Sequence, residues 1–141
     1  MEALGRLFDA AMIADGAPVR LRNCSGVTFL CTAAAAETYT VTYGATSAAA
    51  TDPGDIIDHY YVTLSEDGTT AWSKVDVDPA NNTFLTTAGV PNTVAIHVST
   101  KSLPDDAKYL KCTSTGAGLV SAILHDLESQ RGPANMELVE A

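Results

Sequence analysis

The stretch Thr38–Gly44, with the sequence TYTVTYG, decides the fold class of this chain. Tyr39, Val41 and Tyr43 alternate with threonines, so the apolar and polar side chains of an extended strand would point to opposite faces. β-Branched and aromatic residues favour strands. The stretch therefore predicts a half-buried strand whose threonine face is turned outward.

The same two-residue period recurs on both sides of this strand. Val27, Phe29 and Cys31 alternate with Thr28, Leu30 and Thr32 before it, and Val94, Ile96 and Val98 show the same alternation after it. Further short runs cover 56–64, 70–77, 83–86 and 109–113, and turn signals such as Asp52-Pro53-Gly54 and Asp67-Gly68 separate them. About eight short strands of this kind predict a mainly β fold, an antiparallel β-sandwich or barrel.

The start of the chain has a different period. Within residues 3–14, five apolar residues follow helical spacing: Leu4, Leu7, Phe8, Ala11 and Met12. This stripe predicts a short amphipathic helix that ends before Gly16, a residue able to adopt positive φ. The alternative is a hairpin from Met12–Ala14 to Val19–Leu21, in which Pro18 would confine the second strand to an edge.

The end of the chain is also ambiguous. Residues 119–127 fit a helical stripe, but the β-rich context favours a final strand. Residues 130–141 contain few large apolar residues and predict an extended arm. We therefore divide the chain into an N-terminal amphipathic segment (1–16), a β domain (17–129) and a C-terminal arm (130–141).

Length and charge restrict the function. A chain of 141 residues, 46% of them apolar, can fill the core of one domain. Its net charge of −9 opposes binding to nucleic acid, and no apolar run is long enough to predict a membrane span. The first 16 residues lack the pattern of a secretory signal. Residues 23–73 contain six acids and no Lys or Arg, which indicates either a solvated acidic surface or a docking face for a basic partner.

No motif predicts catalysis, a cofactor or a metal site. The chain has no G-x-S-x-G, P-loop or H-E-x-x-H sequence. His97 falls on the polar face of its strand, and adjacent His125 and Asp126 would point to opposite faces, which prevents a relay between them. We therefore predict no enzymatic activity.

The three cysteines are expected to be thiols without metal or disulfide. The spacing of Cys24 and Cys31 fits no zinc knuckle, and Cys112 stands far from both. Cys31 and Cys112 belong to the apolar faces of their runs and are expected to be buried.

Three stretches carry a resemblance to a known family. They are ADGAPVRLRNCSGVTFLCT (14–32), DPGDIIDHYYV (52–62) and YLKCTSTGAGLVSAILHDLESQRGPANM (109–136). Together they resemble small virion structural proteins of tailed bacteriophages, the capsid decoration or cement proteins. The resemblance implies synthesis in the host cytoplasm and binding to the major capsid protein on the outside of the shell as a homo-oligomer, a trimer being favoured.

Two alternatives stay open beside this interpretation. A head–tail joining or tail component would have the same compositional traits. A carbohydrate-binding module on the particle surface would use exposed faces of Trp72 and the tyrosines, although core packing is the favoured role for most of these rings.

The terminal segments are the predicted attachment sites, because their apolar side chains have no local partner in sequence. Burying one such side chain contributes about 1.5 to 3 kcal/mol, so several together would dominate attachment. The candidate interaction residues are Leu4, Leu7, Phe8, Met12, Met136, Leu138 and Val139.

Overall fold

The structure is a computed structural model. It describes the backbone of residues 8–13 and both backbone and side chains in most of 16–50, 54, 56–65, 69–77, 83–85, 92–116 and 118–125.

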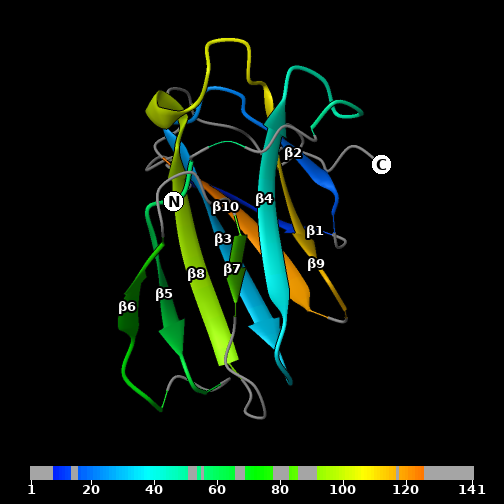
Figure 1. Ribbon diagram of the computed structural model, residues 1–141. Helices are drawn as coiled ribbons and strands as arrows, with labels where there is room; N and C mark the ends of the chain where they lie inside the picture. The colour runs from blue at the N-terminus through cyan, green and yellow to red at the C-terminus, as the bar shows by residue number, and fades with distance from the viewer. Residues whose placement is uncertain are drawn as a thin grey trace, which may run out of the picture.

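The described residues form two antiparallel sheets, as Figure 1 shows. The larger sheet has the strand order β1-β10-β3-β8-β5-β6, and the smaller has the order β2-β9-β4-β7. The elements are β1 (Phe8–Ile13), β2 (Pro18–Arg20), β3 (Gly26–Ala33), β4 (Thr38–Gly44), β5 (His59–Thr63), β6 (Ser73–Asp76), β7 (Thr83–Leu85), β8 (Asn92–Ser99), the 3₁₀ turn η1 (Thr100–Ser102), β9 (Tyr109–Ser114) and β10 (Leu119–His125).

The larger sheet is organised around β3, which lies between β8 and β10. Its ladder to β8 includes all eight residues of β3, and its ladder to β10 includes seven. Because of this register, each inward side chain of β3 from Val27 to Cys31 has an inward side chain of β8 and one of β10 as its neighbours. Phe29, for example, lies between Ile96 and Ala122, and all three are fully buried. The large Phe29 ring therefore lies beside the small Ala122 side chain in the buried layer.

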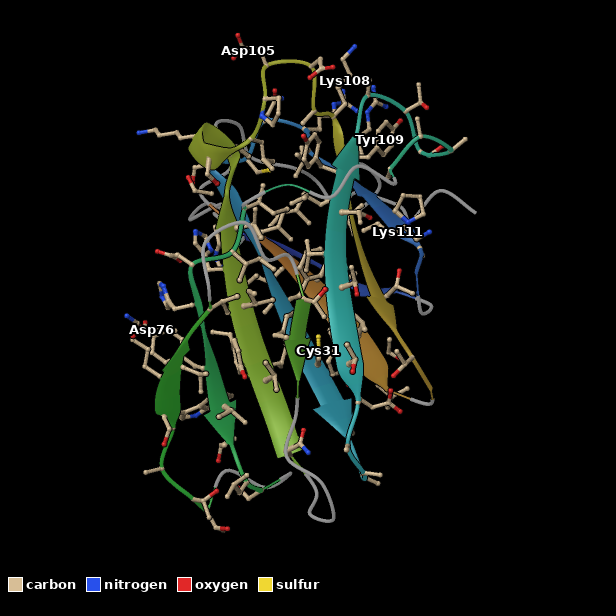
Figure 2. All side chains as sticks on the ribbon, viewed as in Figure 1. Cys31, Asp76, Asp105, Lys108, Tyr109 and Lys111 are labelled. Carbon is tan, nitrogen blue, oxygen red and sulfur yellow. The ribbon has the colours of Figure 1, made fainter. Side chains whose placement is uncertain are left out.

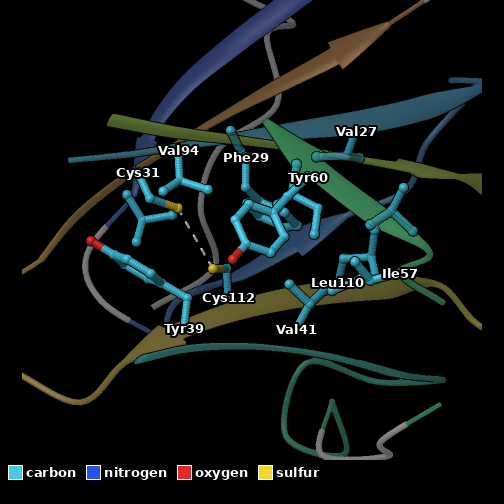
Figure 3. Close-up of a cluster of buried hydrophobic side chains, with 14 of the residues drawn as sticks. Val27, Phe29, Cys31, Tyr39, Val41, Ile57, Tyr60, Val94, Leu110 and Cys112 are labelled. Carbon is cyan, nitrogen blue, oxygen red and sulfur yellow. Dashed lines mark hydrogen bonds between the residues drawn. The ribbon is translucent and has the colours of Figure 1, made fainter. Parts of the chain in front are cut away.

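Aromatic side chains join the two sheets (Figure 3). The hydroxyl of Tyr39, in β4, donates a hydrogen bond of 3.2 Å to the carbonyl oxygen of Thr32 in the other sheet. Phe84, in β7, stacks on the Tyr39 ring at 5.3 Å and also lies 5.3 Å from the ring of Tyr60 in β5. Burial raises the pKa of the Tyr60 phenol, because the charged form would lose water. The core therefore sits between the sheets, and both contribute rings to it.

The mainly β, antiparallel prediction is confirmed, with ten strands in the described residues instead of about eight. Residues 119–125 form a strand, as the β-rich context predicted. Pro18 lies in β2, an edge strand, and Gly16 has a φ of +73°. Cys31 and Cys112 are fully buried, also as predicted, and Cys24 is half-buried.

The prediction of a helix over residues 3–14 is wrong where the structure describes the chain. Phe8–Ile13 form β1, and all six residues pair with β10. A helix of this length is marginal in water, whereas the strand gains a complete ladder along β10. The hairpin alternative is also wrong, because β1 and β2 belong to different sheets. Residues 3–7 and the predicted arm 130–141 lie outside the described residues.

Gly44, at the end of β4, is required by the loop that follows it. The loop folds back so that the backbone of Ala49 and Ala50 contacts the end of β4. A Cβ placed on Gly44 would overlap this backbone. The Thr42 hydroxyl stabilises this position of the loop by donating a hydrogen bond of 2.9 Å to the Ala50 carbonyl oxygen. No side chain fits at residue 44 unless the loop moves.

We predict that Gly44→Ala lowers the free energy of unfolding by about 1 to 3 kcal/mol, because the added methyl group overpacks a backbone contact. Gly116→Ala is the matched control. The atoms nearest to its Cβ belong to the Glu37 carboxylate, the end of a flexible side chain that can rotate away at the loss of one exposed hydrogen bond from Thr115. Urea unfolding of both variants checks this, and equal midpoints would contradict it.

Candidate functional site

All three histidines of the chain lie on the outer face of the larger sheet. The inward positions of β3, β8 and β10 are filled by the core, so the alternate residues point outward. His97 and His125 follow this rule on β8 and β10, and His59 begins β5. The prediction that His97 is exposed on the polar face of its strand is confirmed.

Thr28 connects two of these histidines. Its Oγ1 lies 2.6 Å from His125 Nε2 and 3.2 Å from His97 Nδ1, and the two imidazole rings are 5.5 Å apart. A hydroxyl has one proton, so it can donate to one ring nitrogen while accepting from the N–H of the other. Gly26 makes room for this arrangement, because a Cβ there would overlap the His97 ring.

A shallow hollow of about 430 Å³ lies beside His97. The ladder between β5 and β8 runs from Tyr61–Ala95 to Thr63–Thr93, and the hollow lies beyond it, where His59 and His97 would form the next outward pair. Its lining residues are Ile56, Ile57, Asp58, His59, His97, Ser99 and Ser102.

The polar groups of this hollow are occupied by local contacts. His59 Nδ1 lies 2.7 Å from Asp58 Oδ1. The Ser99 hydroxyl accepts a hydrogen bond from the Lys101 backbone N–H, and the Ser102 hydroxyl donates one of 2.7 Å to the Ser99 carbonyl oxygen. The hydroxyl groups of both serines therefore stabilise the η1 turn. Among the residues that the structure describes, no group of three or more His, Cys, Asp or Glu side chains is placed to hold a metal ion.

The outer edge of the same sheet is charged. Lys74 Nζ lies 2.6 Å from Asp76 Oδ1 on β6, the edge strand. The hydrogen bond from Lys74 holds the pKa of the Asp76 carboxyl below its usual range, and the same bond raises the pKa of the Lys74 ammonium. Charged side chains on an edge strand oppose pairing with the edge of another sheet.

Exposed apolar side chains gather next to this edge. Three of the four large apolar side chains that are exposed among the described residues belong to β5, β6 or their connection. Tyr61 is 43% exposed, Leu64 is 49% exposed directly after β5, and Trp72 is 48% exposed directly before β6. The Tyr61 ring also meets the edge of the His59 ring at 5.4 Å. We name Tyr61 and Trp72, whose rings are exposed at neighbouring positions of the β5–β6 hairpin, the hairpin patch.

Lys74, paired with Asp76, is a basic neighbour of the hairpin patch, and other basic residues lie at another edge of the molecule. Figure 2 shows Lys108, Tyr109 and Lys111 grouped far from Asp76. Arg20, which pairs with Tyr109 across β2 and β9, adds a further positive charge to this region. The charged neighbours of the hairpin patch are therefore Asp58, beside His59, and the Lys74–Asp76 ion pair, and further positive charges lie at another edge.

The predicted interaction residues are only partly placed. Phe8 and Met12 lie in β1, where their backbones pair with His125 and Ser121. The other five lie outside the described residues: Leu4, Leu7, Met136, Leu138 and Val139.

Sequence reasoning missed the hairpin patch. It assigned most tyrosines to the core, which is correct for Tyr39 and Tyr60. The signal was the pair Tyr60-Tyr61, because adjacent residues of a strand point to opposite faces and one ring must face outward.

Comparison with known proteins identifies no relative. No protein-family model matches the chain, and no curated protein is similar to it. In the described part of the chain, no helix is long and apolar enough to cross a membrane.

Replacing Thr28 with Val should separate the two imidazoles that its hydroxyl joins, while keeping the β-branched shape. We expect a loss of about 0.5 to 1.5 kcal/mol in the free energy of unfolding, the usual net value of a hydrogen bond. The imidazole nitrogen resonances of His97 and His125 should shift in NMR spectra, and those of His59 should not. Thr40→Val, on the smaller sheet, is the control. Unmoved resonances of His97 and His125 would contradict the prediction.

Proposed function

We propose that this chain is a non-enzymatic virion structural protein that binds the outer surface of a tailed-phage capsid and stabilises the shell. The sequence stretches that resemble decoration proteins support this proposal. So does a two-sheet domain whose core is filled by its own side chains, which leaves the outer faces available for contact with a larger surface.

The hairpin patch is the observation that carries the proposal. Two exposed aromatic rings at neighbouring positions of one hairpin are typical of a contact surface, because Tyr and Trp are enriched at interfaces. Trp and Tyr are also the residues that contribute most binding energy when they are buried at the centre of an interface. The exposed carboxylate of Asp58 fits a capsid surface with basic groups, whereas that of Asp76 is paired with Lys74.

The terminal residues named above are a second part of the proposed attachment. Phe8 and Met12 lie in β1, and the other five, Leu4, Leu7, Met136, Leu138 and Val139, lie outside the described residues. On the shell the protein is proposed to be a trimer, which sedimentation of the isolated chain and its stoichiometry on particles would measure.

A carbohydrate-binding role is the second candidate, because one observation favours it. Tyr61 and Trp72 both expose their rings, and Trp72 is two residues from Lys74, the register partner of Tyr61. Exposed aromatic rings can stack on the apolar faces of sugars. Binding to a glycan array that is lost in Trp72→Ser would support this role in place of capsid attachment.

The attachment surface can be tested with a variant of the hairpin patch and a control variant at an exposed apolar residue elsewhere on the same sheet. Empty shells of the phage that encodes this chain would be sedimented with the native protein, with Tyr61→Ser/Trp72→Ser, and with Leu119→Ser. We expect at least a tenfold weaker binding for the hairpin variant, since hot-spot residues each contribute about 2 kcal/mol or more. Leu119, 65% exposed at the start of β10, should be replaceable without effect.

Two results would contradict these expectations at different levels. If the native chain does not sediment with shells, the proposed function is wrong. If it sediments and the hairpin variant binds normally, attachment lies elsewhere, and deletion of 131–141 and Leu7→Ser/Phe8→Ser then test the terminal segments.

Shell stability gives an independent prediction. A protein that binds only the assembled shell stabilises it by about 2.7 kcal/mol per site at a hundredfold excess over Kd. Particles that lack this chain should therefore release DNA at a lower temperature than complete particles. A fluorescent DNA dye measures the release, and equal release temperatures would contradict a cementing role.

A further inference from the structure

Two cysteines face each other across the core. Cys31 lies on β3 of the larger sheet and Cys112 on β9 of the smaller sheet. Their sulfur atoms are 4.0 Å apart, the contact drawn as a dashed line in Figure 3, and both residues are fully buried. The third cysteine, Cys24, is half-buried and precedes β3.

The pair sits in the most regular part of the fold. Cys31 pairs in register with Val94 and Val120, and Cys112 pairs with Val41. All of these neighbours are fully or almost fully buried valines. The alternation that directs them inward therefore also directs the two thiols toward each other from opposite sheets.

We propose that Cys31 and Cys112 form an inter-sheet disulfide when the protein leaves a reducing compartment for an oxidising one. The sulfurs would have to approach by about 2 Å, from their present contact to a bond length of about 2.05 Å. In the reducing cytosol the pair stays as thiols, which is the state of the described structure. This inference concerns the isolated chain and does not depend on capsid binding.

The oxidant we name is a low-molecular-weight disulfide such as oxidised glutathione. One cysteine thiolate attacks it, forming a mixed disulfide and releasing one glutathione thiolate. The second cysteine thiolate then attacks the protein sulfur of the mixed disulfide and releases the second glutathione. Two electrons pass to the oxidant, and the two cysteine protons go to solvent or to the released thiolates.

Burial makes this reaction slow in the folded protein, because both thiols must be reached and one must ionise. Oxidation therefore proceeds through conformations in which the sheets open. Once formed, the bond would join the two sheets and restrict the unfolded chain over the sequence separation of 81 from Cys31 to Cys112. The product is a domain that resists opening more than the reduced form does.

The test uses the purified full-length chain, reduced and then incubated with oxidised glutathione. After denaturation and alkylation, we expect two blocked thiols and a mass loss of two hydrogens, with a non-reduced peptide that contains Cys31 and Cys112. The Tm should rise by about 10 °C and return to its starting value with dithiothreitol.

Matched variants separate this pair from the other thiol. Cys24→Ser should behave as the native chain, with the same cross-link and the same rise in Tm. Cys112→Val and Cys31→Val should show no cross-link and no rise. The proposal is overturned if all three thiols stay alkylatable, if the bond involves Cys24, or if the cross-linked protein is no more stable than the reduced one.

Discussion

The pairing of β3 on both sides is the constraint on which the rest of the structure depends. Because β8 and β10 bind its two edges in fixed register, every inward side chain of the three strands falls in a row with its neighbours. A slip of one residue would turn Val27, Phe29 and Cys31 toward solvent. The same register determines the outer face, where Thr28 meets one histidine from each flanking strand.

The sequence contains enough local signal to predict the strands but not their partners. Alternation identified β3, β4 and β8, because each strand has one apolar face. Phe8–Ile13 were mispredicted because their short apolar run fits a helix equally well, and the ladder that decides the matter is contributed by β10, at the far end of the chain. A pattern within a short stretch of sequence does not show which distant strand will pair with it.

The candidate site was predicted less well than the fold, for the same reason. His97 was correctly placed on a polar face, but its approach to Thr28 and His125 depends on the strand order β10-β3-β8, which no spacing in the sequence encodes. Tyr61 and Trp72 became a patch only when β5 and β6 paired. The two-residue period therefore predicts which side chains are buried, whereas the contacts between outward side chains depend on the strand order.

The pairing of the first strand with the last has a consequence for biosynthesis. Phe8 is opposite His125, so the ladder of β1 joins the two ends of the described chain. During translation β1 leaves the ribosome before all the other strands of its sheet and stays without its partner until β10, the last of them, has been made. Domains dominated by contacts this distant in sequence fold slowly, in milliseconds to seconds. The larger sheet is therefore completed only when β10 becomes available, and until then β1 is a segment that chaperones can bind.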